Sequence, residues 1–215
     1  WINDGALQGN PVAAPAPPVY TSGRLIPVAP DLSLKMPTYA SKATSTQDDY
    51  SCFVIPTGLL TNKKIKAIEV VPGNTQTVHH CLVYKVPVGT YTTDTSGTCG
   101  GPSGSSDQLM AGYTPGSSPT VFPSGGSFKS GVSLNTNEEL LFALHYPAGS
   151  AGLIDSTKVN IYFYPDTVTG LREIYAAPVL QNWGFCIDSG AIDTVSDVYP
   201  FSGGLTQDFS LLSVF

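Results

Sequence analysis

The sequence predicts an all-β protein, a two-sheet antiparallel β-sandwich with few or no helices. Three observations support this prediction. Only 12% of the 215 residues are charged, whereas 22 are glycine and 18 are proline, a composition typical of short strands joined by neutral turns. Short apolar runs alternate with turn signals from about residue 31 onward. No stretch combines capping residues with the amphipathic pattern of a helix of three or more turns.

The strand patterns combine β-branched or aromatic residues with turn residues at their ends. The clearest runs cover residues 50–55, 65–71, 77–86, 139–145 and 158–164, and shorter ones cover 174–180 and 211–215. Between residues 86 and 140 lies a long segment rich in Gly, Ser, Thr and Pro. A loop of that length is uncommon in a compact domain, so we expect part of it to form edge strands or a functional loop.

The first 30 residues differ from the rest of the chain. They are rich in proline and include an AAPAPP stretch, which indicates an extended linker on or beside a domain. The sandwich is predicted over residues 31–205. Because the chain opens at Trp1 without an initiator methionine or a signal peptide, we expect it to be a mature or excised piece of a longer protein.

Charge and missing motifs exclude several functions. The net charge of −6 argues against nucleic acid or an anionic membrane as the main partner. No apolar run approaches the length of a membrane span. The GxxxxGK[ST] and GxGxxG motifs of nucleotide sites are absent, as are CxxC and the G-x-S-x-G motif of a serine nucleophile.

All three histidines lie on strong strand patterns. His79 and His80 are adjacent within TVHHCLVYKV, and His145 ends LLFALHYP. Neutral imidazole is a common ligand of Cu, Zn, Fe and Ni, and three imidazoles leave the metal at least one open position. The pattern therefore predicts a metal site built from these three residues. Since adjacent residues on a regular strand point to opposite faces, we expect a bulge, a strong twist or a strand end at the histidine pair.

The cysteines form an even set that is compatible with two disulfides in an oxidising compartment: Cys52, Cys81, Cys99 and Cys186. All three pairings stay open, and the apolar run around Cys81 also fits a buried free thiol. On a regular strand Cys81 would share a face with His79, so a thiolate ligand at the metal is an alternative.

Three longer runs carry a family resemblance: DDYSCFVIP (48–56), EVVPGNTQTVHHCLVYKV (69–86) and ELLFALHYPAGSAGLIDSTKVNIYF (139–163). They resemble the N-terminal domain of the copper type II, ascorbate-dependent monooxygenases, which include peptidylglycine α-hydroxylating monooxygenase and dopamine β-hydroxylase. YTPGS (113–117) and PSG (123–125) resemble the bacterial relatives in particular. The likeness covers about residues 31–190, and its specific part is the His-His pair followed by a His-Tyr on a later strand.

The resemblance implies a jelly-roll-like sandwich in which His79, His80 and His145 bind one copper ion that receives and passes on electrons. Ascorbate, another small reductant or a cytochrome would supply these electrons. The matching tyrosine, Tyr50, would lie near the copper without bonding to it. The family pattern also pairs Cys52 with Cys99, which would leave Cys81 with Cys186. A methionine commonly follows the histidine pair in the family, and Cys81 stands there instead.

The hydroxylating half of the family's active site is missing from this sequence. In the family a following domain holds a second copper, where oxygen and substrate react, through a His-x-His pair and a methionine. This chain has no further histidine, and Met36 and Met110 match nothing in that motif, so we expect no catalytic residue in this chain. DFSLLSVF (208–215) resembles the segment that leads into that domain, and we place this lead-in at residues 206–215. WINDGALQGN (1–10) resembles the tail of an upstream c-type cytochrome domain. These features imply partner domains on the same polypeptide and a periplasmic or secreted location.

Two other functions fit the same residues. A zinc hydrolase or hydratase would use the three histidines and an activated water. No carboxylate lies in an obvious general-base position beside the histidines, and the family resemblance makes Asp48 and Asp49 the nearest candidates. A non-enzymatic carbohydrate-binding or adhesion module would use some of the 11 tyrosines, 9 phenylalanines and 2 tryptophans as a platform.

Overall fold

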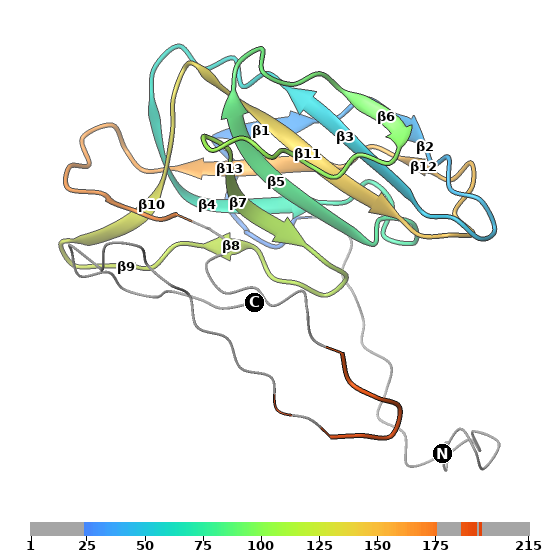
Figure 1. The fold of residues 1–215 in the computed structure, drawn as a ribbon. Helices are drawn as coiled ribbons and strands as arrows, with labels where there is room; N and C mark the ends of the chain where they lie inside the picture. Colours follow the sequence, from blue (N-terminus) through green and yellow to red (C-terminus); the bar gives the residue numbers. More distant parts are fainter. Residues whose placement is uncertain (1–23, 176–185, 193, 195–215) are drawn as a thin grey trace. The chain divides into compact units, whose positions relative to one another are not determined.

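The structure of the chain, a computed structural model, describes residues 24–175, 186–192 and 194 (Figure 1). These residues contain 14 strands and no helix, which confirms the all-β prediction for the described part of the chain. No helix of the described residues is long and apolar enough to cross a membrane. The chain divides into two compact units, residues 1–175 and 176–215, and every described strand belongs to the first.

The larger sheet has seven strands. Its main path runs in the order β1 (Leu32–Lys35), β13 (Lys158–Phe163), β4 (Lys63–Val71), β10 (Phe128–Leu134) and β14 (Arg172–Glu173). Two short strands, β8 (Thr120–Val121) and β9 (Ser124–Gly125), pair with β4 and β10. All pairs are antiparallel except β10 with β14, which are parallel over two residues.

The second large sheet has five strands and carries the histidines. Its order is β6 (Asp94–Gly97), β3 (Asp49–Ile55), β11 (Glu138–Tyr146), β5 (His80–Pro87) and β7 (Gln108–Tyr113), all antiparallel. A small sheet of β2 (Tyr39–Ala40) and β12 (Ile154–Asp155) completes the first unit. In Figure 1 the five-stranded layer crosses in front of β1, β13 and β4.

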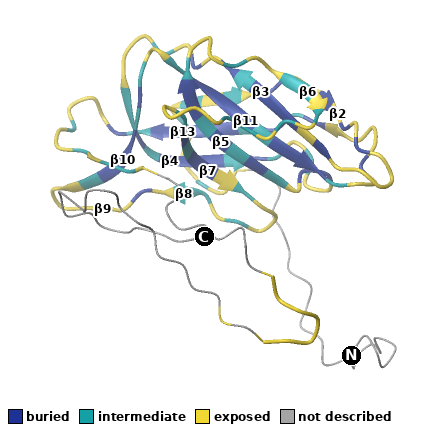
Figure 2. Cartoon of the chain, viewed as in Figure 1, coloured by how far each residue is buried: buried dark blue, intermediate teal, exposed yellow. Residues whose placement is uncertain are grey.

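One hydrophobic core joins the two large sheets. Ile68 and Val159 from the seven-stranded sheet and Phe53, Val83 and Phe142 from the five-stranded sheet belong to the same buried cluster. Because successive strand residues point to opposite faces, each sheet contributes every second side chain to this core. Figure 2 shows the buried positions concentrated on the long central strands, with exposed residues mainly in the loops. This packing leaves the outer face of the five-stranded sheet free for other side chains.

The structure agrees with the five clearest strand predictions and adds one central strand. The predicted runs correspond to β3, β4, β5, β11 and β13, although β5 begins at His80 and not at Thr77. The segment between residues 86 and 140 contains β6 to β10, and β10 lies inside the larger sheet. Its sequence FKSGVSL is weakly apolar partly because Gly131 packs on β4, where an added Cβ would lie 2.0 Å from the carbonyl oxygen of Ile65. This approach requires glycine.

Several predictions fall on residues that the structure does not describe. These are most of the proline-rich segment, the strand at 211–215, most of the strand at 174–180, the boundary near 205 and the lead-in at 206–215. In the second unit the described residues form a turn, in which the N–H of Ala191 donates to the carbonyl of Asp188 over 3.0 Å.

Residues 24–30 lie against the seven-stranded sheet through a buried carboxylate. Glu69 on β4 is 2% exposed, and its Oε1 accepts hydrogen bonds from the backbone N–H groups of Leu25 and Ile26. Its Oε2 accepts from Asn160 Nδ2 over 3.0 Å and from the Tyr162 hydroxyl over 3.1 Å. A buried carboxylate is tolerated only when donors surround it, so this residue ties the segment before β1 to the sheet.

Replacing Glu69 by alanine should release this segment. The change leaves buried donors without an acceptor, at about 1–3 kcal/mol for each orphaned group, so we expect a loss of at least roughly 3 kcal/mol in the free energy of unfolding. Urea unfolding measures this loss, and faster tryptic cleavage after Arg24 reports release of the segment. The control is Asp166→Ala, which removes only an exposed ion pair with Lys63 and should cost less than about 1 kcal/mol. Equal effects of the two changes would contradict the role given to Glu69.

Candidate metal centre

The strand register brings the predicted histidines together at one end of the five-stranded sheet. Tyr50 on β3 pairs with His145 on β11, and His145 pairs with His80 on β5. Residues in register on neighbouring strands point to the same face, so these three side chains form one row. The row lies on the outer face, because Leu144 and Cys81, beside His145 and His80 in the chain, belong to the core between the sheets.

The adjacent histidines reach the same side because β5 begins with an irregular step. Val78 and Cys81 both point into the core, and both histidines between them point outward. The N–H of His79 donates to the carbonyl of His145 over 3.0 Å, although His80 is the registered partner of that residue. Two residues thus lie opposite one, which is the arrangement of a β-bulge at a strand end. The expected departure from a regular strand is confirmed.

The imidazole rings converge through their Nδ1 atoms. Nδ1 of His80 lies 3.3 Å from Nδ1 of His79 and 3.3 Å from Nδ1 of His145, and the three ligand atoms all lie within 4.8 Å of one another. For metal–nitrogen bonds of about 2.0–2.1 Å at near-tetrahedral angles, ligand nitrogens are separated by about 3.3 Å. The residues therefore fit a small transition-metal ion, and this group of three could hold one.

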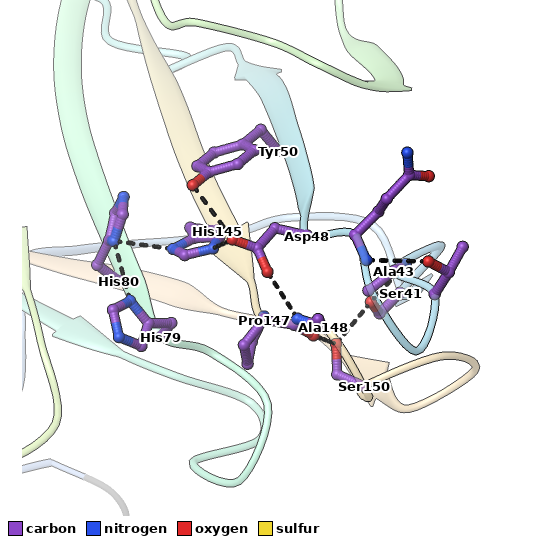
Figure 3. Close-up of polar contacts among 12 residues, drawn as sticks. Ser41, Ala43, Asp48, Tyr50, His79, His80, His145, Pro147, Ala148 and Ser150 are labelled. Carbon is purple, nitrogen blue, oxygen red and sulfur yellow. Dashed lines mark hydrogen bonds and ion pairs between the residues drawn. The ribbon is translucent and has the colours of Figure 1, made fainter. Parts of the chain in front are cut away.

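Accessibility differs among the three rings. His145 is 7% exposed, His80 is half-buried and His79 is exposed. Figure 3 shows His79 and His80 on one side of His145 and Asp48 on the other, with the ring of Tyr50 next to that of His145. A metal held by these rings would be approached from the His79 side.

An aspartate and a tyrosine fix the ring of His145. Oδ2 of Asp48 lies 2.9 Å from Nε2 of His145, and Oδ1 of Asp48 accepts a hydrogen bond from the N–H of Ala148 over 2.7 Å. The ring of Tyr50 stacks on that of His145 with a centroid distance of 4.3 Å and an interplanar angle of 6° (Figure 3). Tyr50 thus lies beside the histidine cluster, and its position near a copper ion stays a prediction. Carboxylates commonly bind the distal nitrogen of metal-ligating histidines in this way.

The second acidic candidate, Asp49, makes its hydrogen bonds on the other face of the sheet. Asp49 is 1% exposed, and its carboxylate accepts hydrogen bonds from the Tyr39 hydroxyl, the Ser51 hydroxyl and the backbone N–H of Lys42. It lies on the core side of the sheet, one residue away from the histidine row. Asp49 is therefore a structural residue, and Asp48 contacts the far nitrogen of His145 rather than the space between the rings.

The cysteines only partly follow the expected pairing. Cys52 and Cys99 form a disulfide with a Cα–Cα distance of 6.0 Å, as the family resemblance implied. The other two cysteines, which the resemblance would leave to pair with each other, are free thiols: Cys81 is wholly buried and Cys186 is exposed. Burial, followed by the nearby charge of Asp155, raises the pKa of the Cys81 thiol well above its usual value. Because the step at the start of β5 places it on the opposite face from both histidines, it is not a metal ligand.

The disulfide anchors a loop over the same outer face. Cys52 lies two residues after Tyr50 on β3, and the N–H of Cys99 donates to the Tyr50 carbonyl over 3.0 Å. Val86, Leu141 and Tyr91 pack with the disulfide in a second apolar cluster. The loop after β5 therefore covers part of the outer face of the sheet. The row of Tyr50, His145 and His80 lies at the edge of the covered part.

Comparison with known proteins adds no identification. No model of a known protein family matches the chain, and no curated protein matches it either. The likeness to the copper monooxygenases therefore rests on the motifs quoted above.

Gly73 should control the position of His79. It lies in the loop from β4 to β5, and a Cβ there would be 2.5 Å from the Ser156 backbone nitrogen and 2.8 Å from Asp155 Oδ1. We expect Gly73→Ala to displace this loop, lower stability by about 1–3 kcal/mol and weaken metal binding, as titration with Cu²⁺ would show. Gly125→Ala is the control, since an added Cβ meets nothing within 4 Å there. Unchanged affinity in the Gly73 variant would refute the link between this loop and the site.

The metal-free protein should lose stability in mildly acidic solution. Burial, followed by the charges of His145 and His79, holds the pKa of His80 below its usual value of 6.5. The unfolded chain therefore takes up a proton at this residue at a higher pH than the folded chain does. The contribution of neutral His80 to the free energy of unfolding is complete above about pH 6.5, and it falls as the pH drops toward the pKa of His80 in the folded protein. Urea midpoints between about pH 8 and pH 5 measure this loss, which His80→Gln should reduce; an unchanged loss in that variant would contradict the assignment.

Proposed function

We propose that this chain is the copper-binding, electron-transfer domain of a copper-dependent, oxygen-using monooxygenase. The convergence of three Nδ1 atoms at 3.3 Å spacing around His80 carries the proposal. The resemblance of the His-His and His-Tyr motifs to the copper monooxygenases favours copper over other metals. The substrate-hydroxylating copper site would belong to a different domain, since all three histidines of the chain are used here.

The residues of the site suit one-electron chemistry. Copper bound here would cycle between its two oxidation states. Three neutral imidazoles supply nitrogen donors without negative charge, which suits both states. His145, held by Asp48 and Tyr50, fixes one ligand direction, and exposed His79 leaves one side open to ascorbate, another small reductant or a cytochrome.

A zinc hydrolase or hydratase is supported less well. Zinc would accept the same ligands, but hydrolysis also needs a base that reaches the metal-bound water. Of the two acidic candidates, Asp49 is enclosed by donors on the core side, and Asp48 is bound to Nε2 of His145 and the N–H of Ala148.

A carbohydrate-binding module is likewise less well supported. A sugar platform needs exposed aromatic rings in one plane. Among the described residues, the exposed large aromatics are Tyr50 on β3, Phe128 on β10 and Tyr175 after β14. The ring of Tyr50 is stacked on a histidine.

The surroundings of the domain follow from the same proposal. The Cys52–Cys99 disulfide is of the kind formed in an oxidising compartment, which supports a periplasmic or secreted location. A following copper domain, and a cytochrome c-like domain before this one, would be partners on the same polypeptide.

Metal analysis tests the proposal directly. After loading with Cu²⁺ and dialysis, we expect one copper per chain and a type 2 EPR signal with nitrogen couplings. His79→Ala and His145→Ala should both lose this signal, because each removes one of three ligands. The isolated chain should insert no oxygen into any substrate, since it contains a single histidine cluster.

Other results would replace the proposal. Stoichiometric zinc with hydrolytic turnover would identify the alternative enzyme class. Absence of stoichiometric metal in the wild-type chain would make the histidines structural, and an intense blue copper signal would contradict the exclusion of Cys81 from the ligand set.

A further inference from the structure

The three ligand rings are not held equally. His145 has the carboxylate of Asp48 on its far nitrogen, and the ring of Tyr50 stacks on its face. Among the described residues no corresponding partner lies on Nε2 of His79 or His80, whose rings make polar contacts between Nδ1 atoms. One ligand is therefore rigidly oriented, and the other two depend on the start of β5.

We propose that Asp48 is a positioning residue that holds His145 with its proton on Nε2 and its Nδ1 lone pair facing the metal. The proposal deepens the function given above and rests on it only in that the histidines hold a metal, whichever metal that is. A carboxylate can only accept here, so a neutral His145 must present an N–H at Nε2. In this tautomer Nδ1 keeps its lone pair and can bind a metal. This is the atom that lies 3.3 Å from Nδ1 of His80.

The same carboxylate links the site to the turn after β11. Its other oxygen accepts from the N–H of Ala148, in the turn that follows His145. That turn is tied to the segment before Asp48 by further bonds: Gly149 N–H to Thr44 carbonyl at 2.6 Å, Gly152 N–H to Ser41 carbonyl at 2.8 Å, and the hydroxyls of Ser150 and Ser41 at 2.9 Å. Figure 3 shows Asp48 between the histidine and this turn. These bonds hold the turn beside the exposed Asp48 side chain and so favour its contact with His145.

An asparagine at this position cannot replace the carboxylate. Its amide has one acceptor oxygen and one donor NH₂ group, whereas both oxygens of Asp48 accept hydrogen bonds. If the amide oxygen faces Ala148, the NH₂ group faces Nε2 of His145 and favours the tautomer with the proton on Nδ1. That tautomer removes the lone pair from the ligand atom. If the amide turns around, the bond to the Ala148 N–H is lost.

The experiment compares the wild-type 215-residue chain with Asp48→Asn and Asp94→Asn. Asp94 is a matched control, since it is a carboxylate at the same side of the five-stranded sheet that accepts from the Ser96 N–H and contacts no histidine. Nitrogen NMR of the metal-free proteins at about pH 8, where histidine is neutral, reports the tautomer of His145. Titrations with Cu²⁺ and with Zn²⁺ report affinity, and thermal unfolding reports stability.

We expect His145 in the wild type to carry its proton on Nε2, and Asp48→Asn to shift it toward Nδ1. Both metals should bind about 10–100-fold more weakly to this variant, as for other losses of partners to ligand histidines. Asp94→Asn should match the wild type in tautomer and affinity. A wild-type proton on Nδ1 overturns the proposal even if the Asp48 variant does not fold. Unchanged affinity in Asp48→Asn, or an equal loss in Asp94→Asn, overturns it as well. Failure of the wild type to bind either metal would refute the proposed function, while the tautomer would still test the contact.

Discussion

The candidate site depends on the register of β11 between β3 and β5. That register places Tyr50, His145 and His80 in one row across three strands, and it is set by the alternation of core residues along each strand. Leu144 and Cys81 must face the core for the sandwich to close, so the residues beside them must face outward. The apolar packing between the sheets thereby fixes where the imidazoles point.

The remaining ligand comes from a local break in this alternation. Val78 and Cys81 are both buried, and two outward residues lie between them where a regular strand allows one. The backbone bond from His79 to the His145 carbonyl stabilises the break. The loop that leads into it is packed tightly, as the close approach of Gly73 to Ser156 indicates. Rigid strands therefore position two of the candidate ligand imidazoles, and a constrained strand end positions the third.

The sequence predicted much of this arrangement from local pattern. Apolar periodicity located the strands that bear the histidines, and the adjacent histidines required a strand end or bulge. Other features depend on contacts between distant residues and left no local signal. Asp48 was a candidate base, and only the register of β3 against β11 shows that it binds the far nitrogen of His145. The central strand β10 was missed because Gly131 and its serine neighbours weaken the apolar pattern, and the role of Glu69 depends on a segment more than 40 residues away.

The alternation of side chains along β5 places the sulfur of Cys81 and the imidazole of His80 on opposite faces of the sheet, although the two residues are adjacent. Cys81 follows His80 directly, and its thiol is enclosed in the core on the reverse side of the sheet. A one-residue slip of a strand exchanges its two faces. A slip of β5 would turn the Cys81 thiol toward the histidine side, but it would also turn Val83 out of the core. The apolar packing that directs the imidazoles outward therefore also keeps sulfur away from the candidate site.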